Sequence, residues 1–242
     1  MSRFKAVIFD LDGTLITSSI DFKLMRERVI SYLLASGIPS EILSASDTVT
    51  SSLARFREFM KKTGEERALE DMEREINSLL IQVELADVAR TTQMNGAKEV
   101  ISDLRREGYR TGLLTRGSRT YALKALEIAG LDDRCFDVIV CRDDFPASET
   151  KPNGKAMERV ARMLNLSSST CLMLGDHPID MYCSIAAGST FVGVLSGWSD
   201  DRTWREKGCS YVIESVADLP AWLLEHASTD LHEGGGGQAR RL

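Results

Sequence analysis

Short apolar runs alternate with helical patterns over much of this chain. The first run, Lys5-Ala6-Val7-Ile8-Phe9, is followed much later by four similar runs, and each interval between the later runs has the apolar spacing of one helix. Because strands that alternate with helices form parallel sheets, the pattern predicts an α/β fold with a doubly wound, Rossmann-like parallel sheet. The predicted strands are 5–9, 110–114, 136–140, 170–174 and 191–195, and the predicted helices are 96–107, 118–129, 154–165 and 179–187; a strand at 211–213 and a helix at 218–225 complete the fold.

The segment from residue 16 to about residue 90 interrupts this alternation. Its apolar residues recur at helical spacing, and no strand pattern is visible between Leu15 and Arg110. We therefore expect an inserted, all-helical domain at 16–90 within a core formed by 1–15 and 91–228, followed by a flexible tail at 229–242. Residues 44–52, rich in Ser and Thr, form either a loop or the cap of the second helix. The apolar positions expected to face the insert's own core are Phe22, Met25, Val29, Tyr32, Leu33, Leu53, Phe56 and Met60, with a long helix at 65–88.

Composition narrows the class of protein. The 242 residues are 43% hydrophobic and 27% charged, which is ordinary for a globular protein, and the formal charge of −6 disfavours a nucleic-acid partner. The sequence shows no long apolar stretch, so we expect neither a signal peptide nor a membrane span. The five cysteines form no Cys-x-x-Cys pair, so we expect reduced thiols and a cytoplasmic protein. The oligomeric state stays open.

Polar residues follow several of the predicted strands. Asp10 and Asp12 follow the first strand, Thr115 follows the strand at 110–114, and Asp176 comes two residues after the strand at 170–174. Lys151 stands just before the helix at 154–165. Right-handed crossovers bring the carboxyl ends of parallel strands to one edge of the sheet, so these side chains are expected to meet there.

Each of these pieces also has a plain structural interpretation. Asp and Gly favour turns, a Thr after an apolar run is often a strand terminus, and a Lys-Pro pair often lies in a solvated loop. Asp180 is either a residue that faces back toward the site or an N-terminal acid that suits the helix dipole. His177 either contacts a substrate or is structural, while Pro178 suits the first position of a helix. The combination of these pieces carries the functional hypothesis.

Their order and spacing resemble the haloacid dehalogenase superfamily, in particular its phosphoglycolate phosphatase-like branch with a helical cap. The resemblance implies that Asp10 is the nucleophile, and that Asp12 is the general acid and base whose backbone carbonyl also binds the metal. It further implies Mg²⁺ ligation by Asp10 and Asp176, with Asp180 outside the ligand sphere, orienting metal waters or Lys151. Thr115 and the amides of Arg116 and Gly117 are expected to bind a phosphoryl oxygen, which Lys151 would help to neutralise.

The expected activity is that of a Mg²⁺-dependent phosphatase acting on a small phosphorylated metabolite, with phosphoglycolate as one candidate. Asp12 favours phosphoryl transfer over carbon–halogen cleavage, because a departing alkoxide needs a proton donor. A hexose phosphate mutase and a non-catalytic binding module remain alternatives. Two departures from the family pattern, Arg116 and His177-Pro178, leave the contacts to the leaving group open. The basic residues of the insert form either a substrate-binding group or a solvated helix face: Arg55, Arg57, Lys61 and Lys62.

Overall fold

The computed structural model describes residues 2–43 and 48–226, which divide into two compact units. Unit 1 consists of residues 1–18 and 89–242, and unit 2 consists of residues 19–88. The tail expected to be flexible, 229–242, and residues 44–47 lie outside the described part of the chain. Among the described helices, none is both long and apolar enough to cross a membrane.

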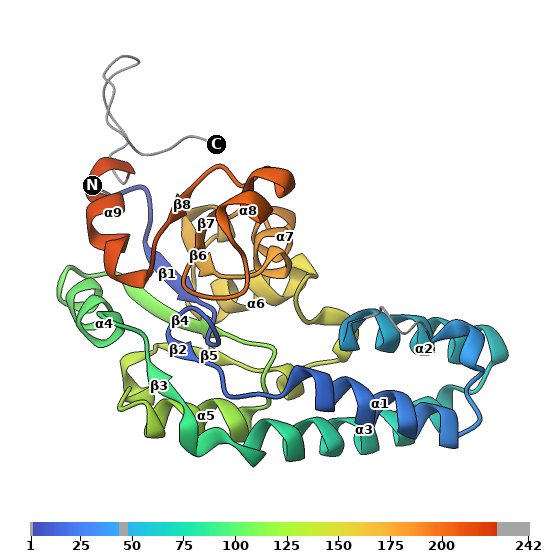
Figure 1. Ribbon diagram of the computed structural model, residues 1–242. Helices are drawn as coiled ribbons and strands as arrows, with labels where there is room; N and C mark the ends of the chain where they lie inside the picture. The colour runs from blue at the N-terminus through green and yellow to red at the C-terminus, as the bar shows by residue number, and fades with distance from the viewer. Residues whose placement is uncertain (1, 44–47, 227–242) are drawn as a thin grey trace. The chain divides into compact units, whose positions relative to one another are not determined.

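Unit 1 is built on a six-stranded sheet in which every pair of neighbouring strands is parallel (Figure 1). The strand order is β5-β4-β1-β6-β7-β8, so β1 lies in the middle and the order reverses beside it. This arrangement confirms the predicted doubly wound parallel α/β core. The strands are β1 (Ala6–Phe9), β4 (Arg110–Leu114), β5 (Val138–Val140), β6 (Cys171–Gly175), β7 (Thr190–Val194) and β8 (Val212–Ile213).

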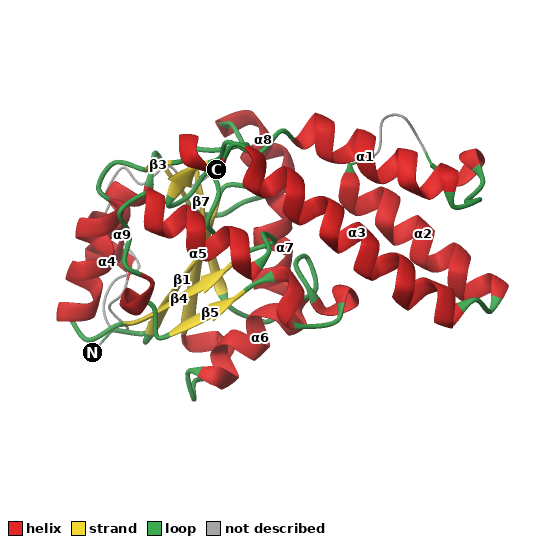
Figure 2. Ribbon diagram, turned by 90° about the horizontal axis from the view of Figure 1, so that it is seen from below, coloured by secondary structure: helices red, strands yellow, loops and turns green. Residues whose placement is uncertain are grey.

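Helices cover both faces of this sheet (Figure 2). On one face, α6 (Gly154–Met163), α7 (Pro178–Ala186) and α8 (Asp201–Lys207) bury Met157, Met181 and Trp204 in a cluster that includes Ile8 of β1 and Met173 of β6. The other face carries α4 (Ala97–Arg106), α5 (Arg119–Ile128) and α9 (Leu219–His226), of which α4 contacts β4 and α9. Both faces of the strands are thus buried, which explains their continuous apolar sequences.

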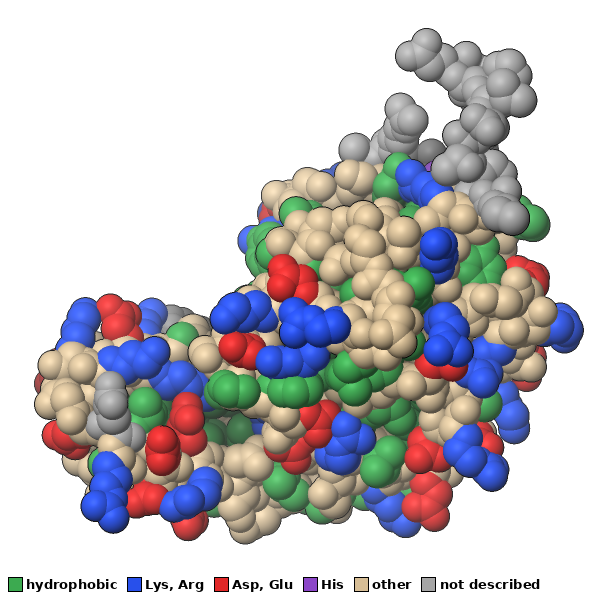
Figure 3. Space-filling model, turned by 180° about the vertical axis from the view of Figure 1, so that it is seen from behind, with side chains coloured by type: hydrophobic (Ala, Val, Ile, Leu, Met, Phe, Trp, Pro, Cys, Tyr) green, Lys and Arg blue, Asp and Glu red, His purple; other side chains and the backbone are tan. Residues whose placement is uncertain are grey.

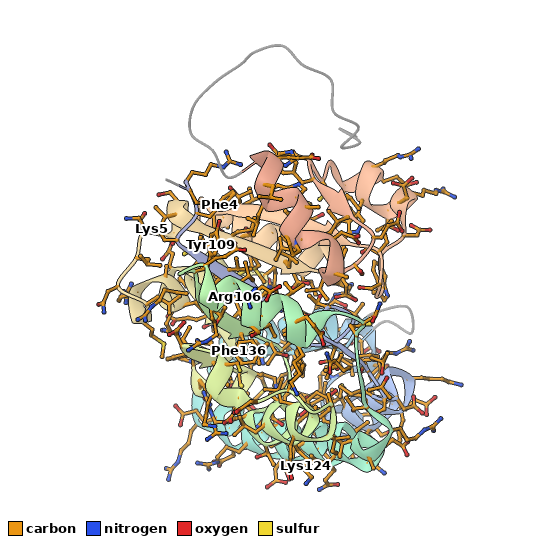
Figure 4. All side chains as sticks on the ribbon, turned by 90° about the vertical axis from the view of Figure 1, so that its left-hand side faces the viewer. Phe4, Lys5, Arg106, Tyr109, Lys124 and Phe136 are labelled. Atoms are coloured by element: carbon orange, nitrogen blue, oxygen red, sulfur yellow. The ribbon has the colours of Figure 1, made fainter. Side chains whose placement is uncertain are left out.

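Strands β1, β4 and β5 are neighbours in the sheet, and their amino ends lie on the side of unit 1 opposite the polar residues predicted to be functional. Figure 4 looks onto this side and labels Lys5, Tyr109 and Phe136, which come just before β1, β4 and β5. Backbone hydrogen bonds tie it together: the Lys5 amide donates to the Thr170 carbonyl at 2.8 Å, and the Arg110 amide donates to the Lys5 carbonyl at 2.9 Å. The carboxyl ends of the strands therefore share the opposite edge.

The sequence patterns missed several short elements of unit 1, among them two strands and one α-helix. The expectation of no strand between Leu15 and Arg110 was wrong, because β2 (Ile16–Thr17) and β3 (Thr92–Gln93) form a small antiparallel pair. Two residues are too few to produce a visible alternation. Helix α8 was also not predicted, since its seven residues bury one large side chain, Trp204.

In its described residues, unit 2 contains three α-helices and a short 3-10 helix at Ser40–Ile42; the α-helices are α1 (Phe22–Ala35), α2 (Val49–Thr63) and α3 (Glu66–Ala86). Their apolar faces form a separate core that includes Val29, Phe56 and Leu80. The prediction that Phe22 belongs to the buried stripe was wrong, because its side chain is 58% exposed at the first position of α1. Thr48 caps α2 by accepting a hydrogen bond from the Ser51 amide at 3.2 Å.

Candidate functional site

The loop that follows β1 carries Asp10 and Asp12. The Asp10 amide donates to the Leu174 carbonyl of β6 at 2.9 Å, which continues the strand pairing and fixes where the side chain begins. The chain then turns at Gly13, whose φ of +78° lies in the left-handed region. A Cβ at Gly13 would lie 2.2 Å from Asp176 Oδ2, so both the conformation and the close approach require glycine.

Asp176 follows β6 and is held by the loop after β7. The Trp198 amide donates to Asp176 Oδ2 at 2.7 Å, and the Ser199 amide donates to the Asp176 carbonyl at 3.1 Å. Gly197 lies against this carboxylate so closely that a Cβ there would be 2.1 Å from Oδ2. The backbone therefore encloses Asp176 from two directions, and its side chain is buried.

Lys151 connects two of the buried carboxylates. Its ammonium group donates to Asp10 Oδ1 and, at 2.6 Å, to Asp180 Oδ1. Asp180 in the first turn of α7 also accepts a hydrogen bond from the His177 amide at 3.1 Å. The position of Asp180 is therefore fixed by both a cation and the helix N-terminus, so its two interpretations from the sequence are compatible.

Three carboxylates meet around this lysine. Oxygens of Asp10, Asp176 and Asp180 lie within 4.8 Å of one another, and all three residues are buried. Three carboxyl groups share the single ammonium group of Lys151 within this cluster. Oxygen donors at this spacing suit a hard divalent cation such as Mg²⁺.

Burial and like charges perturb the titration of these groups. Burial raises the pKa of Asp10 well above its usual range, the charges of Asp180 and Asp176 add to the effect, and Lys151 opposes it. Burial, helped by Asp180, raises the pKa of Asp176 to about 7. Burial alone would lower the pKa of Lys151, but the neighbouring charges of Asp10 and Asp180 raise it instead. Without a further cation, the carboxyl groups of Asp10 and Asp176 therefore hold protons more tightly than ordinary aspartates do.

Thr115 lies at the end of β4, the strand next to β1, and is buried. Its amide donates to the Val140 carbonyl at 3.0 Å, and its hydroxyl accepts a hydrogen bond from the Gly117 amide, also at 3.0 Å. The Gly117 amide, expected to bind a phosphoryl oxygen, is therefore bonded within its own loop here. Arg116 contributes its carbonyl to a hydrogen bond from Arg142 Nη1 at 3.0 Å.

Asp12 is paired with a residue that the sequence did not single out. The Tyr121 hydroxyl donates to Asp12 Oδ1 at 2.5 Å. Tyr121 belongs to α5, far from Asp12 in sequence, and its side chain is fully buried. The only signal in the sequence was its place in the first turn of the helix after Thr115.

His177 has a structural role in this fold. Its Nδ1 accepts a hydrogen bond from the Ile179 amide at 3.1 Å, so it caps α7, and the helix begins at Pro178 as expected. The imidazole also lies against the Trp198 ring, with centroids 4.4 Å apart. Burial lowers the pKa of His177, which favours the neutral ring that this cap requires.

Two of the four basic residues singled out in α2 form described ion pairs within unit 2. Arg57 Nε lies 2.5 Å from Glu73 Oε1 of α3, and Lys62 Nζ lies 2.8 Å from Glu58 Oε1 one turn earlier in α2. Arg55 and Lys61 are exposed on the same helix. On the face that Figure 3 shows, basic and acidic side chains are intermixed over this unit. The exposed Lys62–Glu58 pair favours a solvated helix face for Lys62, whereas Arg57, whose side chain is 24% exposed, links α2 to α3.

Comparison with known proteins agrees with this geometry. A family model described as haloacid dehalogenase-like hydrolase matches residues 4–188. The phosphoglycolate phosphatase of Nitrosospira multiformis is 26% identical over 88% of this chain and 92% of its own length. The glyceraldehyde 3-phosphate phosphatase of Pyrococcus furiosus is 25% identical, over 92% and 93% respectively. The crystal structure of a hydrolase from Pseudomonas syringae is 25% identical, with a TM-score of 0.67, and the match covers 93% of this chain and 100% of that one.

These similarities confirm the resemblance drawn from the motifs, both to the superfamily and to its phosphoglycolate phosphatase-like branch. The matched residues include Asp10, Asp12, Thr115, Lys151 and Asp176. The chain therefore belongs to the haloacid dehalogenase-like hydrolase family.

Proposed function

We propose that this protein is a Mg²⁺-dependent phosphatase that hydrolyses a small phosphorylated metabolite through an aspartyl-phosphate on Asp10. The observation that supports this most strongly is the buried cluster in which Asp10 lies with Asp176 and Asp180 and is hydrogen-bonded to Lys151. A carboxylate at the end of a central parallel strand, beside a cation, is suited to attack an anionic electrophile.

The donor set fits Mg²⁺. Asp10, Asp176 and the backbone carbonyl of Asp12 would hold the ion. Both side-chain oxygens of Asp180 already accept hydrogen bonds, Oδ1 from Lys151 and Oδ2 from the His177 amide, whereas the hydrogen bonds described above engage one carboxylate oxygen each of Asp10 and Asp176. When bound, Mg²⁺ offsets the charge of the carboxylates and of the phosphoryl oxygens. We assign Asp180 to positioning Lys151.

Asp10, Asp12, Lys151 and Thr115 have separate roles in the two steps of the proposed reaction. An oxygen of Asp10 forms a bond to phosphorus as the bond from phosphorus to the ester oxygen breaks, and Asp12 gives its proton to that departing oxygen. Water next attacks phosphorus, Asp12 takes its proton, and the bond between Asp10 and phosphorus breaks to release phosphate. Lys151 offsets negative charge on Asp10 and on the transferring group, and the Thr115 hydroxyl binds one phosphoryl oxygen.

The substrate we favour is a small phosphate monoester with a second polar group. Relatives similar to this chain are named for phosphoglycolate and for glyceraldehyde 3-phosphate, both of which have this form. Phosphoglycolate is the first compound to test. We further propose that the helical unit serves as a cap, with Arg55 and Lys61 as its candidates for substrate contact.

Phosphate release tests the proposal. The purified protein would be assayed on phosphorylated acids, sugars, nucleotides and pyrophosphate, with Mg²⁺ and with EDTA. We expect Mg²⁺-dependent phosphate release from at least one small monoester. Asp10→Asn should lower kcat by a factor on the order of 10³ or more, because an amide cannot form the acyl phosphate.

The matched control is Asp133→Asn, which makes the same change at an exposed aspartate and should retain activity. Absence of phosphate release from every ester would contradict the proposal. Interconversion of hexose phosphates without release of phosphate would instead identify a mutase. Full activity of Asp10→Asn would reject Asp10 as the nucleophile.

A further inference from the structure

Tyr121 is a fully buried tyrosine whose hydroxyl lies at the proposed acid–base residue. It donates to Asp12 Oδ1 at 2.5 Å, a short distance typical of a hydrogen bond from a hydroxyl to a carboxylate. The two residues are 109 positions apart in sequence. The contact therefore depends on the fold and joins the start of α5 to the loop after β1.

The backbone around Tyr121 fixes the direction of its ring. The Tyr121 amide donates to the Ser118 hydroxyl, which caps α5, at 3.2 Å. A Cβ at Gly117 would lie 2.7 Å from Tyr121 Cδ1, so the ring fits at this place because residue 117 is a glycine. Because the helix cap fixes the backbone and the side chain is fully buried, the hydroxyl is held at a defined place.

The Asp12 carboxylate is more exposed than the other three carboxylates of the site. Asp10, Asp176 and Asp180 are all less than a tenth exposed, and each is held by hydrogen bonds to Lys151 or to a backbone amide. Asp12 is only partly buried. A general acid has to stay within hydrogen-bonding distance of the oxygen that it protonates, so its effect depends on the orientation of its carboxyl group.

We propose that Tyr121 is a positioning residue that holds the Asp12 carboxylate in the orientation required for proton transfer. This inference rests on the proposed phosphatase activity and adds to it a residue that does not contact the substrate. Tyr121 keeps its own proton throughout. Asp12 Oδ2 gives its proton to the ester oxygen as the bond from phosphorus to that oxygen breaks, and it regains a proton from the water that attacks the aspartyl-phosphate.

The dependence on the leaving group separates positioning from a general structural role. An alkyl phosphate such as phosphoglycolate releases a strongly basic alkoxide, which needs the proton of Asp12. p-Nitrophenyl phosphate releases a phenolate that is stable without one. Because kcat/KM reports the steps up to the first phosphoryl transfer, a misdirected Asp12 should lower kcat/KM for the alkyl ester selectively.

The experiment compares Tyr121→Phe with wild type on both esters in the presence of Mg²⁺. We expect kcat/KM for the alkyl phosphate to fall about tenfold or more, while kcat/KM for p-nitrophenyl phosphate changes less than about threefold. The kcat for p-nitrophenyl phosphate should also fall, with a burst of p-nitrophenol, because Asp12 activates water in the second step. Tyr109→Phe, which removes a hydroxyl at the opposite edge of the sheet, is the matched control and should match wild type.

A double-mutant cycle provides the second test. In an Asp12→Asn background, Tyr121→Phe should cause no further loss of kcat for p-nitrophenyl phosphate, because a positioning residue acts only through its partner. Equal losses for both esters, an unchanged ratio between them, or the same loss with and without Asp12 would each overturn the inference. If wild type released no phosphate from any ester of the panel, the proposed function itself would fail, so the two failures are distinguishable.

Discussion

Asp176 should reduce the stability of the metal-free protein as the pH rises, and Asp176→Asn should remove that effect. The pKa of this carboxyl is raised from 3.8 to about 7 by burial and by the charge of Asp180. Between pH 4 and pH 7 the unfolded chain therefore releases a proton that the folded protein keeps. The free energy of unfolding falls across this window, since the unfolded state binds fewer protons.

The size of the effect follows from the shift. About three pKa units at about 1.4 kcal/mol each correspond to about 4 kcal/mol at pH 8, where the carboxylate is charged in both states. Below pH 4 the group is neutral in both states and contributes nothing to the difference. An amide oxygen at the same place can still accept the hydrogen bond from the Trp198 amide, which in the native protein is 2.7 Å from Oδ2. Asp176→Asn should therefore gain stability over wild type as the pH rises, with little difference at pH 4.

Urea unfolding in EDTA at pH 5, 6, 7 and 8 measures this difference. The three tryptophans, at 198, 204 and 222, all belong to unit 1, so their fluorescence reports the unfolding of the unit that contains the site. Mg²⁺ should stabilise wild type at pH 8 and the variant much less, because the variant lacks one carboxylate ligand. The reasoning is refuted if the difference in unfolding free energy between variant and wild type is the same at pH 5 and pH 8.

Two further predictions concern the metal and the helical unit. The affinity for Mg²⁺ should rise with pH between 6 and 8, because the ion displaces protons from carboxyls such as Asp176, whose pKa is about 7. Isothermal titration calorimetry in buffers of different ionisation heat should show this release of protons. An affinity that does not depend on pH would contradict the prediction. Phe56→Ala should destabilise unit 2 by about 3–5 kcal/mol, because the side chain of Phe56 is fully buried. Phe22→Ala, at a side chain that is 58% exposed, should change the stability of unit 2 by less than about 0.5 kcal/mol. Circular dichroism during urea unfolding measures both changes, and equal losses of stability would contradict the prediction.

The sequence predicted the parts of the fold that depend on local pattern. The strands of unit 1 are buried on both faces, so their apolar runs were visible, and helix stops and caps set most boundaries within two residues. The pattern failed where an element depends on a partner that is distant in sequence. Strands β2 and β3 exist because Ile16 pairs with Gln93 and Thr17 with Thr92, and two residues carry no periodicity of their own. Phe22 has helical spacing, but it stands at the first position of α1 and its side chain remains 58% exposed.

In the candidate site, too, some features depend on local sequence pattern and others depend on residues that are distant in sequence. Asp10, Thr115 and Asp176 follow strands, so strand prediction and the rule for parallel sheets were sufficient to place them at one edge. The hydrogen bond between Tyr121 and Asp12 depends on the direction of one side chain in α5. The Gly117 amide donates to Thr115, although the sequence favoured a phosphate contact, because a backbone amide takes the nearest acceptor available. Such contacts depend on side-chain geometry that periodicity does not encode.

The charges of the site indicate why the proposed activity needs a cation. Lys151 lies between Asp10 and Asp180 and offsets about one negative charge, while Asp176 receives hydrogen bonds only from backbone among its described contacts. A phosphate monoester brings up to two more negative charges toward the same oxygens. In a site where these side chains are less than a tenth exposed, water screens that repulsion poorly. A divalent ion held by Asp10 and Asp176 would reverse the balance, so on the proposed function the substrate should bind productively only to the protein that already holds Mg²⁺ or together with the ion.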